Sequence, residues 1–164
     1  MGASQNYFTK LTYIIMSMQT TLVLLKPDCV QRNLMGEVIG RFERKGLTIL
    51  GMKMLQLDDA LINEHYGFLS DKPFFPSIVT YMKSSPIVAM AVKGANAVKT
   101  IRTMSGATNP VDALPGTIRG DFALSIDGNI MHASDSVTTA EEELERFFKK
   151  EEIFEYERLD NKVL

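Results

Sequence analysis

Residues Asn129 to Ser136 bring together side chains that can carry out nucleophilic or acid–base chemistry. The segment is Asn-Ile-Met-His-Ala-Ser-Asp-Ser, so His132 is followed closely by two hydroxyls and a carboxylate. Glu143 lies on the helix expected next and can fold back to accept a hydrogen bond from one ring nitrogen. Such a partner fixes the tautomer and leaves the other ring nitrogen nucleophilic. His132 is therefore a candidate nucleophile, with a packing role at a strand end as the alternative.

A second candidate feature is the glycine- and proline-rich segment from Ser105 to Gly120, which shows no hydrophobic periodicity. Arg102, Thr108, Asn109 and Arg119 lie in it or beside it. Such side chains are the donors that a polyphosphate needs, and a loop this long inside a compact domain is usually functional or disordered. The segment therefore predicts an anion-binding loop, although isolated arginines are more often surface charges.

Several matches to other site motifs fail on their chemistry. The segment 94–100 looks like a phosphate-binding loop, but it lacks the second glycine before Lys99. Arg119-Gly120-Asp121 is interpreted as a chance match to an adhesion tripeptide. With two histidines and one cysteine in the chain, a zinc site built from histidine and cysteine is not expected.

The hydrophobic pattern predicts the elements that must position these residues. Strands are expected at 21–25, 47–57, 86–92 and 129–132. Helices are expected at 34–42, from Asp58 or Asp59 to Leu69, and at 74–82, 95–104 and 137–148. The residues Lys26-Pro27-Asp28 have the composition of a turn. Thr138 and Glu141 fit a capping box for the last helix, with Val137 on its buried face.

The order of these elements contains the split β-α-β-β-α-β pattern, in which helices cover a sheet on one side. We therefore predict a ferredoxin-like α+β fold with an antiparallel sheet and one long Pro/Gly-rich loop, with a small parallel α/β sheet as the alternative. Residues 1–18 are expected to form an N-terminal extension outside the main fold, with their order left open. Residues 19–164 are expected to form a single catalytic domain.

Composition limits the partners and the compartment. The chain has 164 residues, with 18 basic and 20 acidic side chains and a net charge of −2, which argues against a protein that coats nucleic acid. No run of about 18 apolar residues is present, so no membrane partner is expected. The single cysteine, Cys29, and the absence of an Asn-x-Ser/Thr sequon favour a reducing, cytoplasmic location.

The segment Asn129-Ile-Met-His132-Ala-Ser134-Asp135 resembles the active-site signature of the nucleoside diphosphate kinases. Further blocks resemble that family in the same order: Lys26-Pro27-Asp28-x-Val30-Gln31-Arg32, His65-Tyr66, Pro73-Phe74-Phe75-Pro76, Thr108-Asn109-Pro110 and Pro115-Gly116-Thr117-Ile118-Arg119-Gly120-Asp121-Phe122. The match covers roughly residues 20–156. Six ordered blocks are far more specific than a single motif.

The resemblance implies a ferredoxin-like core and a ping-pong transfer of the γ-phosphate from a nucleoside triphosphate, such as ATP, to a nucleoside diphosphate. By the matched motifs, His132 would become phosphohistidine. Glu143 would bind its other ring nitrogen, and Ser134 would bind Glu143. Lys26 and Tyr66 would lie beside the transferring phosphate.

The same resemblance implies how the nucleotide is held. Phosphate oxygens would be bound by Arg102, Thr108 and Arg119. The ribose would be reached by Asn129 and Lys26, and the base would stack on Phe74 with Ile78 opposite. Mg²⁺ is expected, bound mainly through the phosphates. The resemblance also implies a homohexamer in which the loop 105–120 meets its equivalents, with a tetramer as the alternative.

Some residues depart from the family pattern. Ala133 stands where glycine is commoner, Cys29 stands where a smaller residue is usual, and Ala107 replaces a commonly acidic residue.

The alternative functions are a non-catalytic nucleotide-binding module, a sequence-specific DNA binder, and a ribonuclease using His65 and His132 as acid and base. The retained candidate residues favour the kinase.

Overall fold

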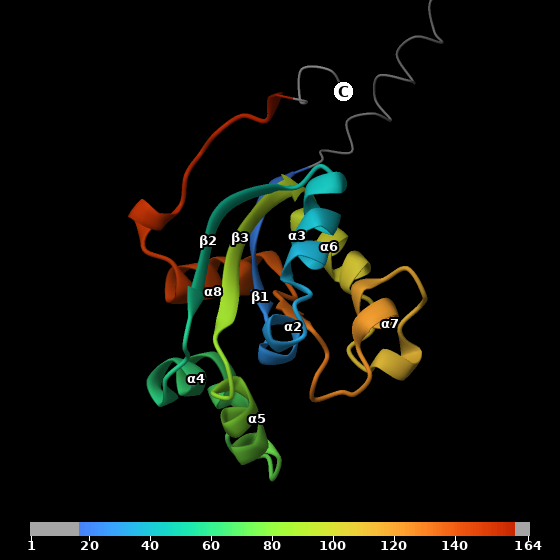
Figure 1. The fold of residues 1–164 in the computed structure, drawn as a ribbon. Coiled ribbons are helices and arrows are strands. Elements are labelled where there is room, and N and C mark those ends of the chain that lie inside the picture. Colours follow the sequence, from blue (N-terminus) through green and yellow to red (C-terminus); the bar gives the residue numbers. More distant parts are fainter. Residues whose placement is uncertain (1–16, 160–164) are drawn as a thin grey trace, which may run out of the picture.

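The computed structural model describes residues 17–159, which form an α+β fold on one four-stranded antiparallel sheet. The strands are β1 (Met18–Leu25), β2 (Thr48–Leu55), β3 (Ile87–Ala95) and β4 (Met131–Ala133), and they lie in the order β2-β3-β1-β4 (Figure 1). β1 pairs with both β3 and β4, and every pairing is antiparallel. The ferredoxin-like prediction is confirmed, and the parallel alternative is excluded.

The helices connect the strands and carry five of the predicted site residues: Tyr66, Ile78, Arg102, Arg119 and Glu143. They are α2 (Pro27–Gln31), α3 (Met35–Arg44), α4 (Asp59–Tyr66), α5 (Phe75–Met82), α6 (Ala97–Ser105), α7 (Ile118–Phe122) and α8 (Val137–Phe147). Short 3₁₀ turns follow at η1 (Gly67–Leu69), η2 (Pro110–Asp112) and η3 (Lys150–Glu152). The predicted loop 105–120 is irregular except for Ser105, the last residue of α6, for η2 and for the first residues of α7.

Helices pack against both faces of the sheet, so the prediction of cover on one side was wrong. Each residue of Leu22–Leu25 in β1 is fully buried, and successive side chains point to opposite faces. One face packs with Ile62 of α4 and Phe147 of α8, and the other with Phe42 of α3 and Ile101 of α6. A continuous apolar strand requires cover on both faces, because neither face can be left to water.

Two local predictions also differ from the structure. The expected turn at residues 26–28 is the start of α2, because Pro27 occupies its first turn, where a missing N–H costs nothing. The last helix is capped by Ser136, whose hydroxyl accepts from the Thr139 N–H at 3.1 Å, and not by Thr138. The helix therefore begins at Val137, which lies in its first turn and is 43% exposed instead of buried.

The predicted N-terminal extension falls mostly outside the described residues. β1 begins at Met18, and the carbonyl of Ser17 accepts from the Asn96 N–H at 2.9 Å. The single catalytic domain at 19–164 stays a prediction. Within residues 17–159, no helix is both long and apolar enough to cross a membrane.

Candidate active site

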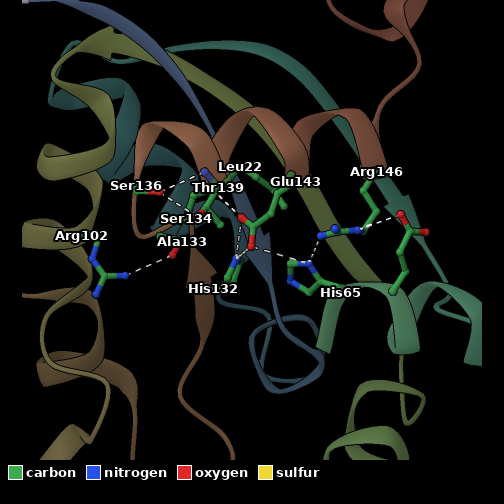
Figure 2. A network of polar contacts seen from close by, with 11 residues as sticks. Leu22, His65, Arg102, His132, Ala133, Ser134, Ser136, Thr139, Glu143 and Arg146 are labelled. Atoms are coloured by element: carbon green, nitrogen blue, oxygen red, sulfur yellow. Dashed lines mark hydrogen bonds and ion pairs between the residues drawn. The ribbon is translucent and has the colours of Figure 1, made fainter. Parts of the chain in front are cut away.

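His132 lies in the short strand β4, and its ring contacts a buried carboxylate. The Glu143 oxygens Oε1 and Oε2 lie 2.9 and 3.0 Å from His132 Nε2 (Figure 2). The Ser134 hydroxyl donates to Glu143 Oε2 at 2.6 Å. A carboxylate can only accept, so Nε2 carries the proton and Nδ1 keeps its lone pair. The arrangement makes Nδ1 the nucleophilic atom of the ring.

Glu143 is ionised despite its burial. Burial alone would raise the pKa of the carboxyl, but the hydrogen bonds from His132 and Ser134 outweigh it and hold the pKa below its ordinary value. The side chains of His132, Ser134 and Glu143 are brought together by β4 and α8. Ser134 is two residues beyond His132, and Glu143 lies on the face of α8 that packs toward β1.

A strained turn precedes His132 and sets the direction in which β4 begins. Ile130 has φ of +72°, and the Met131 N–H donates to the Asn129 carbonyl at 2.8 Å, which defines a γ-turn. Backbone strain of this kind costs about 1–3 kcal/mol and persists only where neighbours hold it. The neighbours are Asp28 Oδ2, which accepts from the Ile130 N–H at 3.1 Å, and the Lys26 N–H, which donates to the Ile130 carbonyl at 2.9 Å. Asp28 is a site residue that sequence analysis missed.

Arg119 forms hydrogen bonds that join the loop 105–120 to the segment that leads into β4, the strand of His132. Its guanidinium donates to the carbonyls of Asn129 at 3.2 Å, Gly106 at 2.9 Å and Met131 at 2.7 Å. These bonds use three of its five N–H groups, so two remain for an anion. Burial and the neighbouring Arg102 lower the pKa of Arg119 to about 10, so it stays charged near neutrality.

Further cationic and polar groups lie around the ring of His132. Lys26 Nζ donates to Asn129 Oδ1 at 2.6 Å, and Asn129 Nδ2 donates to the Thr108 carbonyl at 3.0 Å. Arg102 donates to the Ala133 carbonyl at 3.4 Å. Burial and the charge of Arg119 lower the pKa of Lys26 to about 8. These groups place three cationic side chains in a pocket that also contains the carboxylates Asp135 and Glu143.

Tyr66 presents an unused donor to this pocket. Its hydroxyl is buried and has no hydrogen-bond partner within residues 17–159. Burial raises the pKa of Tyr66 above its ordinary value, so the hydroxyl keeps its proton. A buried donor without a partner is costly, and Tyr66 lines the cavities beside His132 and Phe74, so its hydroxyl is a candidate donor to a ligand.

The predicted site residues line two joined pockets. A pocket of about 420 Å³ contains His132, Glu143, Lys26, Tyr66, Arg102, Thr108, Arg119 and Asn129. A more apolar pocket of about 560 Å³ contains Phe74 and Ile78, and it shares Lys26, Tyr66, Thr108 and Asn129 with the first. Ser134 lies behind Glu143. Together the pockets form a polar inner end and an apolar outer end.

Two residues noted in the sequence have other roles. The Asn109 side chain caps η2, accepting from the Val111 N–H and donating to Asp112. His65 is buried, and burial together with His132 lowers its pKa to about 3. A histidine that stays neutral cannot serve as the general acid of a ribonuclease, so this observation weighs against that alternative.

The site as a whole suits phosphoryl transfer through a histidine, because a nucleophilic nitrogen faces a pocket of cationic donors. The sequence profile of the family described as nucleoside diphosphate kinase matches residues 19–153. A nucleoside diphosphate kinase from Methanobrevibacter smithii is 51% identical over 146 residues, covering 89% of this chain and 97% of that protein. One from Archaeoglobus fulgidus is 53% identical over 143 residues, covering 87% and 95%.

Solved structures agree with the sequence comparison. The structure of a halophilic nucleoside diphosphate kinase from Halobacterium salinarum in complex with CDP superposes with a TM-score of 0.87 at 39% identity. The superposition covers 90% of this chain and 98% of the other. The chain belongs to the nucleoside diphosphate kinase family.

Proposed function

We propose that this protein is a nucleoside diphosphate kinase that transfers the γ-phosphate of a nucleoside triphosphate to a nucleoside diphosphate through a phosphohistidine on His132. The observation that carries the proposal is the double contact of Glu143 with His132 Nε2, at 2.9 and 3.0 Å. This contact leaves Nδ1 unprotonated beside the cationic pocket, where a phosphate can reach it.

The chemistry follows in two half-reactions. His132 Nδ1 attacks the γ-phosphorus, the bond from that phosphorus to the β–γ bridging oxygen breaks, and the nucleoside diphosphate leaves with the electron pair. The positive charge that develops on the ring is stabilised by Glu143 through the Nε2 proton. In the second half, a β-phosphate oxygen of the acceptor attacks the phosphorus and the P–Nδ1 bond breaks. No proton has to leave the ring in either direction.

The inner pocket supplies the groups that bind the phosphates. The two unused N–H groups of Arg119 and the exposed end of Arg102 would neutralise phosphate oxygens on either side of Nδ1. Thr108 adds a hydroxyl at the pocket wall. Lys26 and the unpartnered Tyr66 hydroxyl would contact the transferring phosphate. Most of the catalysis in such a transfer comes from this positioning and charge stabilisation.

The outer pocket would hold the sugar and the base. Asn129 and Lys26, which already contact each other at 2.6 Å, would bind the ribose hydroxyls. Phe74, half exposed, would stack on the base, with Ile78 on the other face. Contacts with the faces of a base tolerate different bases, because they leave no polar group to discriminate between them.

Members of this family use a divalent cation, and we propose Mg²⁺ for this one. Within the described part of the chain, the side chains that come nearest to a metal cage are His65, His132 and Glu143. Glu143 already binds His132 Nε2, and His65 Nδ1 already contacts Arg146. The residues therefore fit a cation that is held by phosphates and water, with Asp135 lining the same pocket. When bound, Mg²⁺ would neutralise charge on the phosphate oxygens.

The proposal extends to assembly and location. We propose a homohexamer, with a tetramer as the alternative, in which the loop 105–120 contacts its equivalents near Pro110. Val111 and Leu114 on this loop are 87% and 73% exposed, and apolar side chains of this kind favour an interface. Light scattering should give a hexamer for the wild type and smaller species for Val111→Asp. We also propose the cytoplasm, because the one cysteine is buried and reduced.

Labelling tests the function directly. Incubation with γ-labelled ATP and Mg²⁺ should give acid-labile, base-stable label on the protein. His132→Gln should remove both the label and the transfer to a nucleoside diphosphate. His65→Phe removes the only other histidine of the chain and should still take up label. Label that survives in His132→Gln would overturn the assignment.

A further inference from the structure

The catalytic carboxylate has a second imidazole beside it. His65 Nδ1 lies 3.8 Å from Glu143 Oε1, while His132 Nε2 lies 2.9 Å from the same oxygen (Figure 2). The side chain of His65 is 1% exposed, and its ring meets the ring of His132 edge to face at 4.8 Å. The Glu143 carboxylate could therefore accept from either histidine.

Arg146 decides which nitrogen of His65 carries the proton. Its Nη1 lies 3.3 Å from His65 Nδ1, on the side of His65 away from His132 (Figure 2). A guanidinium can only donate, so Nδ1 accepts and the proton is on Nε2. Arg146 is held in place by Glu64, whose Oε1 accepts from its Nε at 3.1 Å.

No other contact explains this tautomer. His65 Nε2 is buried and has no hydrogen-bond partner in the described part of the chain, so its proton gains nothing there. The opposite tautomer would direct an Nδ1–H toward Glu143 Oε1, 3.8 Å away. In the absence of Arg146 that tautomer is the better one, because a shift of about 1 Å brings this donor within hydrogen-bond distance of the carboxylate, whereas a proton on Nε2 has no acceptor. Glu143 would then be shared between two rings.

We propose that Arg146 is a positioning residue that acts through His65: by donating to His65 Nδ1 it prevents His65 from binding Glu143, and so reserves Glu143 for His132. The inference rests on the proposed function, since it concerns the same nucleophile.

The competition for Glu143 depends on the charged and titratable groups that face His65. The groups that face His65 are Glu143 and Arg146 from α8, His132 from β4 and Lys26 from the segment after β1, with Glu64 and Tyr66 beside it on α4. Burial and the positive neighbours keep the pKa of His65 at about 3. Removing Arg146 removes one positive charge and so raises this pKa, but burial, the largest cause of the low value, remains. His65 therefore stays neutral near pH 7, and it competes for Glu143 through its Nδ1–H over that whole range.

The test is a double-mutant cycle in which kcat is measured as a function of pH for each variant. Arg146→Leu should lower kcat about tenfold between pH 6 and pH 8, the effect of weakening one charge-assisted hydrogen bond, with KM little changed. Arg146→Lys keeps a donor and should restore kcat. In the His65→Phe background, Arg146→Leu should have no further effect. Arg44→Leu, an exposed arginine on α3, is the matched control.

A second measurement tests the tautomer itself. ¹⁵N spectra of histidine-labelled wild-type protein should show His65 protonated at Nε2 only, and Arg146→Leu should move the proton to Nδ1. Three results would overturn the proposal: a proton on Nδ1 in the wild type, an Arg146→Leu variant with the kcat of the wild type, or an equal loss of kcat in the His65→Phe background. The ¹⁵N result stands even if no phosphohistidine forms, so failure of the proposed function is distinguished from failure of this inference.

Discussion

Replacing Asp28 by asparagine tests whether a remote carboxylate holds the strained turn before the nucleophile. Asp28 accepts two hydrogen bonds, one from the Tyr81 hydroxyl at 2.5 Å and one from the Ile130 N–H at 3.1 Å. An asparagine has one acceptor oxygen, and its amide nitrogen can only donate. The substitution therefore leaves either Tyr81 or Ile130 without an acceptor.

The magnitude follows from these contacts. A buried donor without a partner costs about 1–3 kcal/mol, and the turn at Ile130 stores strain of about the same size. The free energy of unfolding should therefore fall by about 1–3 kcal/mol in Asp28→Asn, or about 2–4 °C in Tm per kcal/mol for a chain of this length. If the turn relaxes, His132 moves, and a displacement of about 1 Å can lower kcat up to about 10²-fold.

Urea unfolding and a coupled assay of nucleoside diphosphate phosphorylation would measure both effects. Tyr81→Phe removes one donor and gives the control. In Asp28→Asn with Tyr81→Phe, the single oxygen can serve Ile130, so the double variant should lose less stability than the sum of the two single variants. Additive losses, or an Asp28→Asn variant with wild-type stability and kcat, would refute the reasoning.

Three other substitutions test the remaining assignments. The charged form of Lys26 is lost as pH rises through its pKa of about 8, so kcat/KM should fall above that pH; Lys26→Arg stays charged, and persistence of the same alkaline limb would contradict the role of Lys26. Ser134→Ala removes a 2.6 Å hydrogen bond to a buried carboxylate, worth about 1.5–3 kcal/mol; kcat should drop about 10- to 100-fold with KM unchanged, and a rise in KM alone would argue against it. Phe74→Ala should raise KM for every nucleoside diphosphate and reduce the advantage of purines; a preference of about 10⁴ for one base in the wild type would mean that a polar group distinguishes the base edge.

The elements whose burial depends on their own composition were predictable from the sequence. The apolar run at Leu22–Leu25 predicted a buried strand, and it lies at the centre of the sheet. The cluster around His132 predicted a nucleophile next to Glu143, and the two side chains are in contact. The error about one-sided cover came from the fold pattern, since the continuity of the same run already required two covered faces.

What the sequence could not predict depends on contacts between distant segments. The positive φ of Ile130 is unusual for a β-branched residue, and it is set by Lys26 and Asp28, which lie about a hundred positions earlier. The contact between His65 and Arg146 likewise joins α4 to α8. No local sequence pattern predicts such contacts, because each of the two segments, taken alone, has the composition of an ordinary helix.

The wall that we propose for the base is only partly buried. α5 stands at the end of the sheet beyond β2 and β3 (Figure 1) and buries only Met82, whereas most of β1 and β3 is buried. Segments with so little buried surface open at low free energy. We expect amide hydrogen exchange in α5 to be faster than in the central strands and to slow when a nucleotide stacks on Phe74. The rate at which this helix opens would then set how quickly the spent nucleotide departs, and so the turnover of the whole cycle.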